Sequence, residues 1–80
     1  MRYEHSVNVS YPADDYPTGD QLICELIGKK ENDGSGIGMG ERDVSFYFKT
    51  LDSAVTAYKK LSKFKKLEIR GLSINLVEFD

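Results

Sequence analysis

The residues with the most distinctive spacing are the three glycines of Gly36-Ile-Gly38-Met-Gly40. A dinucleotide-binding loop has the pattern G-x-G-x-x-G between a strand and a helix, whose N-terminus meets the pyrophosphate. Here Glu41 takes the place of the third glycine, a predicted strand follows, and the Gly-Lys-Ser/Thr sequence of a phosphate loop is absent. The spacing therefore disfavours nucleotide binding. Two interpretations remain: an edge strand with a bulge or strong twist, or a bare strand against which a partner docks.

The other reactive side chains do not form a recognisable catalytic or metal-binding set. Cys24 and His5 are the only cysteine and histidine, and no base or second ligand is placed beside either by spacing. Asp33, Glu41 and Asp43 are close in sequence, in a predicted hairpin region where solvated acids are usual. The sequence therefore predicts no catalytic residue, no metal site and no cofactor.

The elements that position these residues begin with a strand and a helix. Residues 3–11 alternate between apolar and polar side chains, as in a half-buried strand, and prolines at 12 and 17 then interrupt regular structure. Thr18 with Gln21 matches a capping box and opens a helix. The apolar stripe of this helix is Leu22, Ile23, Leu26 and Ile27. Gly28 or the turn at residues 32–34 is expected to end it.

Two further strands are predicted around the glycines. Ile37 and Met39 are expected to share one face of a strand over residues 34–40, with the glycines on the other face. Glu41-Arg42 would then turn the chain into the alternating strand at residues 44–48. In such an arrangement the glycine strand is at the edge of the sheet.

A second helix and a last strand complete the pattern. Thr50 or Asp52 is expected to cap the helix, and residues 67–79 form the strand. The apolar stripe of this helix is Ala54, Ala57, Tyr58, Leu61 and Phe64. The order β-α-β-β-α-β predicts one α+β, ferredoxin-like domain over residues 1–80, a four-stranded antiparallel sheet with two helices on one face.

The core is predicted on the helix-covered side of this sheet. Its expected members are Val7, Val9, Val44, Phe46, Phe48, Ile74 and Leu76 from the sheet, and Leu22, Ile23, Leu26, Ala54, Ala57, Tyr58 and Leu61 from the helices.

Composition favours a soluble globular protein. Hydrophobic residues make up 40% and charged residues 30%, and no apolar run is long enough to span a membrane. The single cysteine and the absence of a signal-like start predict a cytoplasmic protein. Charge is uneven: residues 1–48 carry four basic and nine acidic side chains, whereas residues 49–80 carry seven basic and four acidic. This asymmetry favours solvated faces of unequal sign, and the alternative is head-to-tail association or a charged partner.

Part of the chain resembles an RNA-recognition motif. The strand at 46–48 with the helix at 52–61 resembles that family's third strand and second helix, and residues 69–76 resemble its last strand. The resemblance implies the same fold and an open sheet face that stacks bases on three aromatic side chains. Those positions fall on Asn8, Asp43 and Ser45. Since none is aromatic and one is anionic, nucleic-acid binding is not expected.

The predicted function is non-enzymatic: a small binding protein of the accessory, inhibitor or immunity type, which associates with a protein partner or with its own copy. The expected interface consists of Gly36, Ile37, Gly38, Met39, Gly40, Glu41, Arg42 and Tyr47. The alternatives are a ligand-sensing regulatory module, by analogy of fold, and an atypical single-stranded nucleic-acid binder. No membrane or metal partner is expected.

Overall fold

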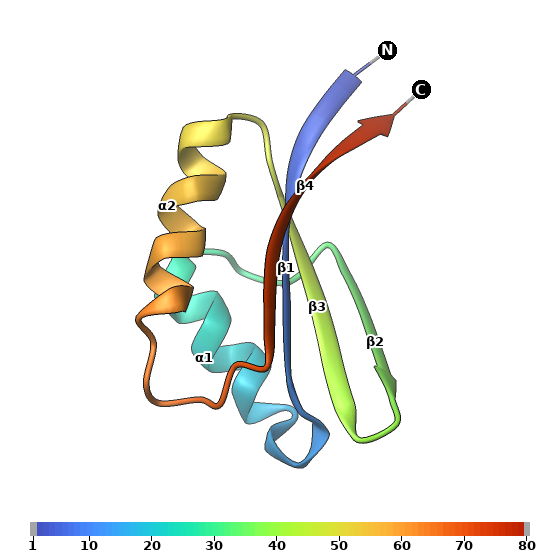
Figure 1. Cartoon of the computed structure of the whole chain (residues 1–80), viewed down its shortest axis with the longest axis vertical. Helices are drawn as coiled ribbons and strands as arrows, with labels where there is room; N and C mark the ends of the chain where they lie inside the picture. Colours follow the sequence, from blue (N-terminus) through green and yellow to red (C-terminus); the bar gives the residue numbers. More distant parts are fainter. Residues whose placement is uncertain (1, 80) are drawn as a thin grey trace.

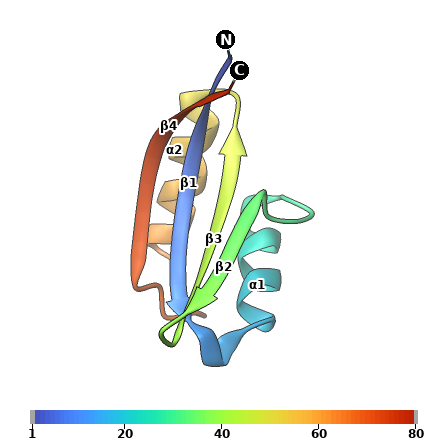
Figure 2. The same ribbon diagram turned by 90° about the vertical axis from the view of Figure 1, so that its right-hand side faces the viewer.

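Four antiparallel strands and two α-helices are described by the computed structural model, which covers residues 2–79. In chain order the elements are β1 (Arg2–Pro12), the short 3-10 helix η1 (Ala13–Asp15), α1 (Thr18–Ile27), β2 (Gly34–Gly38), β3 (Glu41–Phe48), α2 (Leu51–Ser62) and β4 (Gly71–Phe79). The strands lie in the order β2-β3-β1-β4, so β2 and β4 form the two edges. Both helices cover one face (Figure 1), and the other face is open (Figure 2). This is the ferredoxin-like βαββαβ fold that the sequence predicts.

The helix ends confirm two of the predicted caps and not a third. Gly28 ends α1 in the left-handed conformation, with φ 74°, and the Thr50 side chain accepts a hydrogen bond from the Ser53 N–H to begin α2. The capping box expected at Thr18 does not form, because Pro17 occupies the N-cap position and makes no side-chain cap. Thr18 is instead the first residue of the helix itself.

The β2–β3 hairpin turns two residues earlier than predicted. Met39 and Gly40 both have positive φ, 52° and 81°, and Gly38 pairs with Glu41. Positive φ at both central residues defines a type I′ turn, which suits the twist of the flanking strands. Met39 is therefore in the turn and does not share a strand face with Ile37, and Glu41-Arg42 belong to β3.

The core is a layer between the helices and the covered face of the sheet. Its buried hydrophobic members are Val7, Val9, Tyr11, Ile23, Val44, Phe46, Ala54, Ala57, Leu61 and Leu67. Eight of these were predicted, whereas Tyr11 and Leu67 were not. Phe48, Ile74 and Leu26 pack against the cluster while remaining half-buried. Cys24 also packs against the cluster and is likewise half-buried.

The β4 prediction needs two corrections. The strand begins at Gly71 instead of residue 67, and Leu76 is 62% exposed although it was assigned to the core. The start of β1 and the end of β4 extend together past the helix layer (Figure 1). Since Leu76 pairs with His5 near this projecting end, it keeps the predicted face but has no helix to pack against.

Candidate functional site

The outer edge of β2 is formed by the backbone of Ser35 and Ile37. The pairs Gly34–Ser45, Gly36–Asp43 and Gly38–Glu41 join β2 to β3, and Gly38 and Glu41 close the two-residue turn. Antiparallel strands alternate hydrogen-bonded and non-hydrogen-bonded pairs, so the three glycines direct their N–H and C=O groups toward β3. Ser35 and Ile37 direct theirs away from the sheet. These outward groups are called the β2 edge below.

Two side chains cover the neighbouring part of β3, beyond the end of β2. The Asp33 carboxylate accepts a hydrogen bond from the Tyr47 N–H at 2.8 Å, and the Lys29 ammonium donates to the Tyr47 carbonyl at 2.9 Å. The same ammonium lies 4.5 Å from the centre of the Phe48 ring. This Lys29–Asp33 clip satisfies the backbone groups that β2 is too short to reach. It also shows that Tyr47 points its backbone toward the β2 side, in agreement with the register above.

On the open face, β2 presents a strip without side chains, and carboxylates of β3 border this strip. Gly34, Gly36 and Gly38 lie on this face, and a Cβ built on Gly36 or Gly38 would meet no atom within 4 Å. We call these three positions the glycine shelf. Asp43 and Glu41 pair with Gly36 and Gly38 and therefore project from the same face. The site is thus flat, open and acidic.

A hollow of about 430 Å³ lies on this surface, and Asp43 contributes to it. Its lining residues are Gly36, Ile37, Gly38, Met39, Glu41 and Asp43. A second hollow of about 450 Å³, over the centre of the sheet, is also lined by Asp43. Asp43 is exposed, and no described cation forms an ion pair with it, whereas Glu41 lies 3.8 Å from the Arg70 guanidinium.

Apolar side chains accompany the β2 edge on the helix-facing side and at the tip. Ile37 is 56% exposed and Met39 is fully exposed. The turn itself is held in place, because the Gly40 carbonyl accepts a hydrogen bond from the Ala13 N–H at 2.9 Å. A fixed hairpin with exposed apolar groups is suited to contact with another chain.

Seven of the eight predicted interface residues are on the accessible surface of this region or beside it, but Arg42 is not. Tyr47 projects onto the open face and makes an edge-to-face contact with Phe79, at 5.4 Å between ring centres. Arg42 instead points to the helix layer. There its guanidinium donates to the Asp20 carboxylate, with an Nη2–Oδ2 distance of 2.7 Å, and it lies 4.4 Å from the Tyr16 ring centre.

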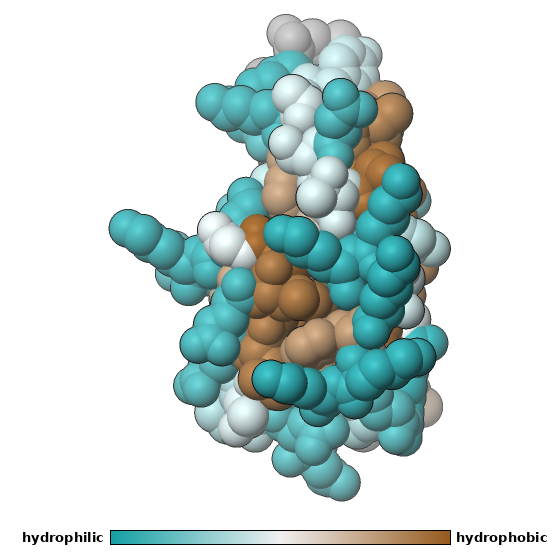
Figure 3. Space-filling model, turned by 90° about the vertical axis from the view of Figure 1, so that its left-hand side faces the viewer, coloured by the Kyte–Doolittle hydropathy of each residue, from teal (hydrophilic) through white to brown (hydrophobic). Residues whose placement is uncertain are grey.

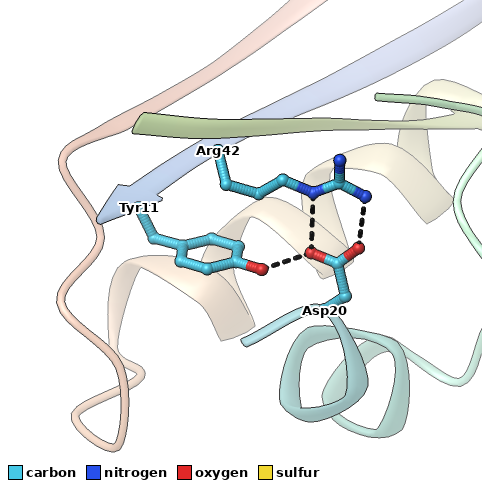
Figure 4. Close-up of polar contacts among 3 residues, drawn as sticks. All are labelled: Tyr11, Asp20 and Arg42. Atoms are coloured by element: carbon cyan, nitrogen blue, oxygen red, sulfur yellow. Dashed lines mark hydrogen bonds and ion pairs between the residues drawn. The ribbon is translucent and has the colours of Figure 1, made fainter. Parts of the chain in front are cut away.

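Arg42 belongs to a buried polar cluster with Tyr11 and Asp20 (Figure 4). The Tyr11 hydroxyl donates to the same carboxylate, and a side chain at Gly19 would collide with the Tyr11 ring. Burial and the Asp20 carboxylate raise the pKa of Tyr11 well above its ordinary value, and the hydrogen bond to Asp20 raises the pKa of Arg42. The cluster joins Asp20 of α1 to Tyr11 and Arg42 of the sheet, and the Tyr11 side chain is fully buried.

The centre of the open sheet face is polar. Asn8 accepts hydrogen bonds from the hydroxyls of Ser45 and Ser6, at 2.7 and 2.9 Å, and its amide lies 3.5 Å from the Ser73 hydroxyl. Asn8, Ser45 and Asp43 are the positions at which an RNA-recognition motif would carry aromatic rings. In this chain they form a hydrogen-bonded and anionic surface with no stacking platform.

The helix layer contains a second possible binding surface. A hollow of about 200 Å³ between α1 and the chain after α2 is lined by Leu22, Glu25, Leu26, Phe64 and Lys66. Figure 3 shows an apolar area on this side of the molecule, framed by hydrophilic side chains. Lys59, Lys60, Lys63, Lys65 and Lys66 are all exposed on α2 or just after it. Apolar and basic groups thus adjoin here, on the opposite layer from the glycine shelf.

The remaining reactive groups do not form a site in the described part of the chain. Cys24 is a free thiol whose pKa is raised by burial, which disfavours the reactive thiolate. Among residues 2–79, no three His, Cys, Asp or Glu side chains are placed to hold a metal ion. No helix in that range is long and apolar enough to cross a membrane.

Comparison of the chain with protein-family models, with characterised proteins and with solved structures gives no match.

Proposed function

We propose that this chain is a small, non-enzymatic binding domain that associates with another protein by accepting an extended segment of the partner at the β2 edge. The observation that carries the proposal is the outward-facing backbone of Ser35 and Ile37, at an edge of the sheet, beside the glycine shelf. An added strand would pair with these groups, while its side chains pack beside Ile37 on one face and over bare backbone on the other.

Several features support protein binding over the alternatives. Asn8, Asp43 and Ser45 stand at the positions where an RNA-recognition motif stacks bases on aromatic side chains, and Asp43 with Glu41 repels phosphate. The hollows of the described surface are open, and none encloses the small, convergent set of polar groups that a metabolite site requires. A cytoplasmic setting remains a prediction of the sequence.

The test is nuclear magnetic resonance of the labelled chain with a panel of short, acetylated, extended peptides of basic, neutral and acidic character. We expect the largest shift changes, and slower hydrogen exchange, at the amides of Ser35 and Ile37. Ser35→Pro should abolish binding, because it removes one outward N–H but no hydrogen bond to β3. The matched Ser35→Ala variant should bind like the parent chain.

A different result would place the interface elsewhere. If Ser35→Pro binds as tightly as Ser35→Ala, or if the shift changes centre on β4 or on Asn8, strand addition at β2 is wrong.

A further inference from the structure

We infer that the β2 edge selects a basic segment: an extended strand in which lysine or arginine alternates with apolar residues, its cations crossing the glycine shelf to reach Asp43 and Glu41. This inference rests on the proposed strand addition and specifies its partner. The occupant is argued from charge complementarity and from the register of the hairpin.

The register places a partner's side chains in two rows. Residues directly opposite in neighbouring strands share a face, so partner residues opposite Gly36 and Gly38 project on the open face. Neighbouring strands are about 4.8 Å apart, which puts such a residue roughly 10 Å from the Cα of Asp43, with only Gly36 between them. A lysine or arginine side chain spans most of this gap and the Asp43 side chain spans the rest. A side chain at position 36 would obstruct the path.

The intervening partner residue lies on the helix-facing side. There it is opposite Ile37, which is 56% exposed and directed toward that side through its pairing with Arg42. An apolar residue at this position would bury part of the Ile37 surface. The recognised pattern is therefore basic, apolar, basic.

The charge distribution of the hairpin disfavours a second copy of this chain as the occupant. Arg42 is the nearest cation in sequence, but it is turned to the other face and neutralised by Asp20, so it does not offset Asp43. A second copy pairing through its own β2 would bring glycines to these positions and no cation for Asp43, which, unlike Glu41, forms no ion pair with a described cation. Two outward residues also provide few backbone hydrogen bonds, so side-chain contacts must supply much of the affinity and the selectivity.

The experiment compares three peptides of one length, in which valine alternates with lysine, glutamine or glutamate, by isothermal titration at low and physiological salt. We expect the lysine peptide to bind at least tenfold more tightly than the glutamate peptide. Asp43→Asn should weaken the lysine peptide about fivefold and leave the glutamine peptide unchanged, with a smaller difference at higher salt. Gly36→Val, which meets no neighbouring atom, should weaken the lysine peptide about tenfold.

Asp52→Asn is the control, because it removes an exposed carboxylate from α2 and should not change binding. Any of three results overturns the basic-partner inference: equal affinity for the three peptides, no measurable binding of the lysine peptide, or no effect of Asp43→Asn. If these results occur while Ser35→Pro still abolishes binding of the glutamine peptide, strand addition stands and only the charge selection is wrong. If Ser35→Pro binds the lysine peptide normally, both proposals fail.

Discussion

The two edges of the sheet are open in different ways. β2 has two outward-facing residues, Ser35 and Ile37, whereas the pairing of β4 with β1 leaves the backbone of four residues facing outward. Those four are Leu72, Ile74, Leu76 and Glu78. By backbone alone, β4 is the larger template for an added strand.

The side chains beside each edge instead favour β2 as the more selective binding edge. The open face of β4 carries Ser73 and Asn75, which are uncharged, and an added strand would meet them before it reached β1. The open face of β2 carries no side chain at all, and the first groups across it are carboxylates. An unpaired backbone accepts many sequences, whereas a bare strip in front of fixed charges distinguishes between them. The selective binding that we propose is therefore expected at the shorter edge.

The strands near the two edges also differ in how deeply their apolar side chains are buried. Replacement of a large apolar residue should give the largest difference in stability between them. Phe46 in β3 is completely buried, whereas Leu76 in β4 is 62% exposed. Phe46→Ala should lower the free energy of unfolding by about 3–5 kcal/mol, because it removes buried contacts and leaves a cavity. Leu76→Ala should change it by less than about 1 kcal/mol. Denaturant titration measures both; equal losses would contradict the burial of Phe46 and the exposure of Leu76.

The ion pairs of the two sides provide a second comparison. Arg42 and Asp20 are largely buried beneath the hairpin, with side-chain exposures of 11% and 16%, whereas Arg70 near the start of β4 pairs with Glu68 in solvent. Arg42→Met should destabilise the chain by about 2–3 kcal/mol, since it leaves the Asp20 carboxylate buried without its cation. Arg70→Met should have a much smaller effect, because solvent already screens its pair. A similar loss in the two variants would mean that the buried cluster does not anchor the hairpin.

Sequence alternation predicted the strands, their faces and most of the core, because a buried face imposes a period of two on every strand. The errors arose where the decisive factor is not periodic. Met39 takes positive φ in the turn although methionine gives no turn signal, and Leu76 is exposed because the helices end before it does. The side to which Arg42 points could be predicted from the sequence, since Arg42, Val44 and Phe46 are two residues apart and therefore share one face of the strand. Its partner Asp20 could not be predicted, because the two residues are brought together only by the tertiary contact of α1 with β3.

The Lys29–Asp33 clip gives the finest test of the difference between the edges, because it covers backbone on the β2 side only. Among the described residues, no side chain hydrogen-bonds to the outward groups of β4, whereas Asp33 and Lys29 occupy both backbone groups of Tyr47. Asp33→Ala removes a charged acceptor from a solvent-exposed N–H, so water replaces part of the lost bond. The free energy of unfolding should fall by about 1 kcal/mol.

Hydrogen exchange at the Tyr47 amide should accelerate in Asp33→Ala while the amides of Val44 and Phe46, which face β1, keep their protection. Glu31→Ala, which removes a nearby exposed carboxylate, is the matched control and should leave Tyr47 unchanged. If the Tyr47 amide exchanges at the parent rate in Asp33→Ala, the clip does not protect this stretch of β3. The β2 side would then be as uncovered as β4, and the contrast between the two edges would depend on the glycine shelf and its carboxylates alone.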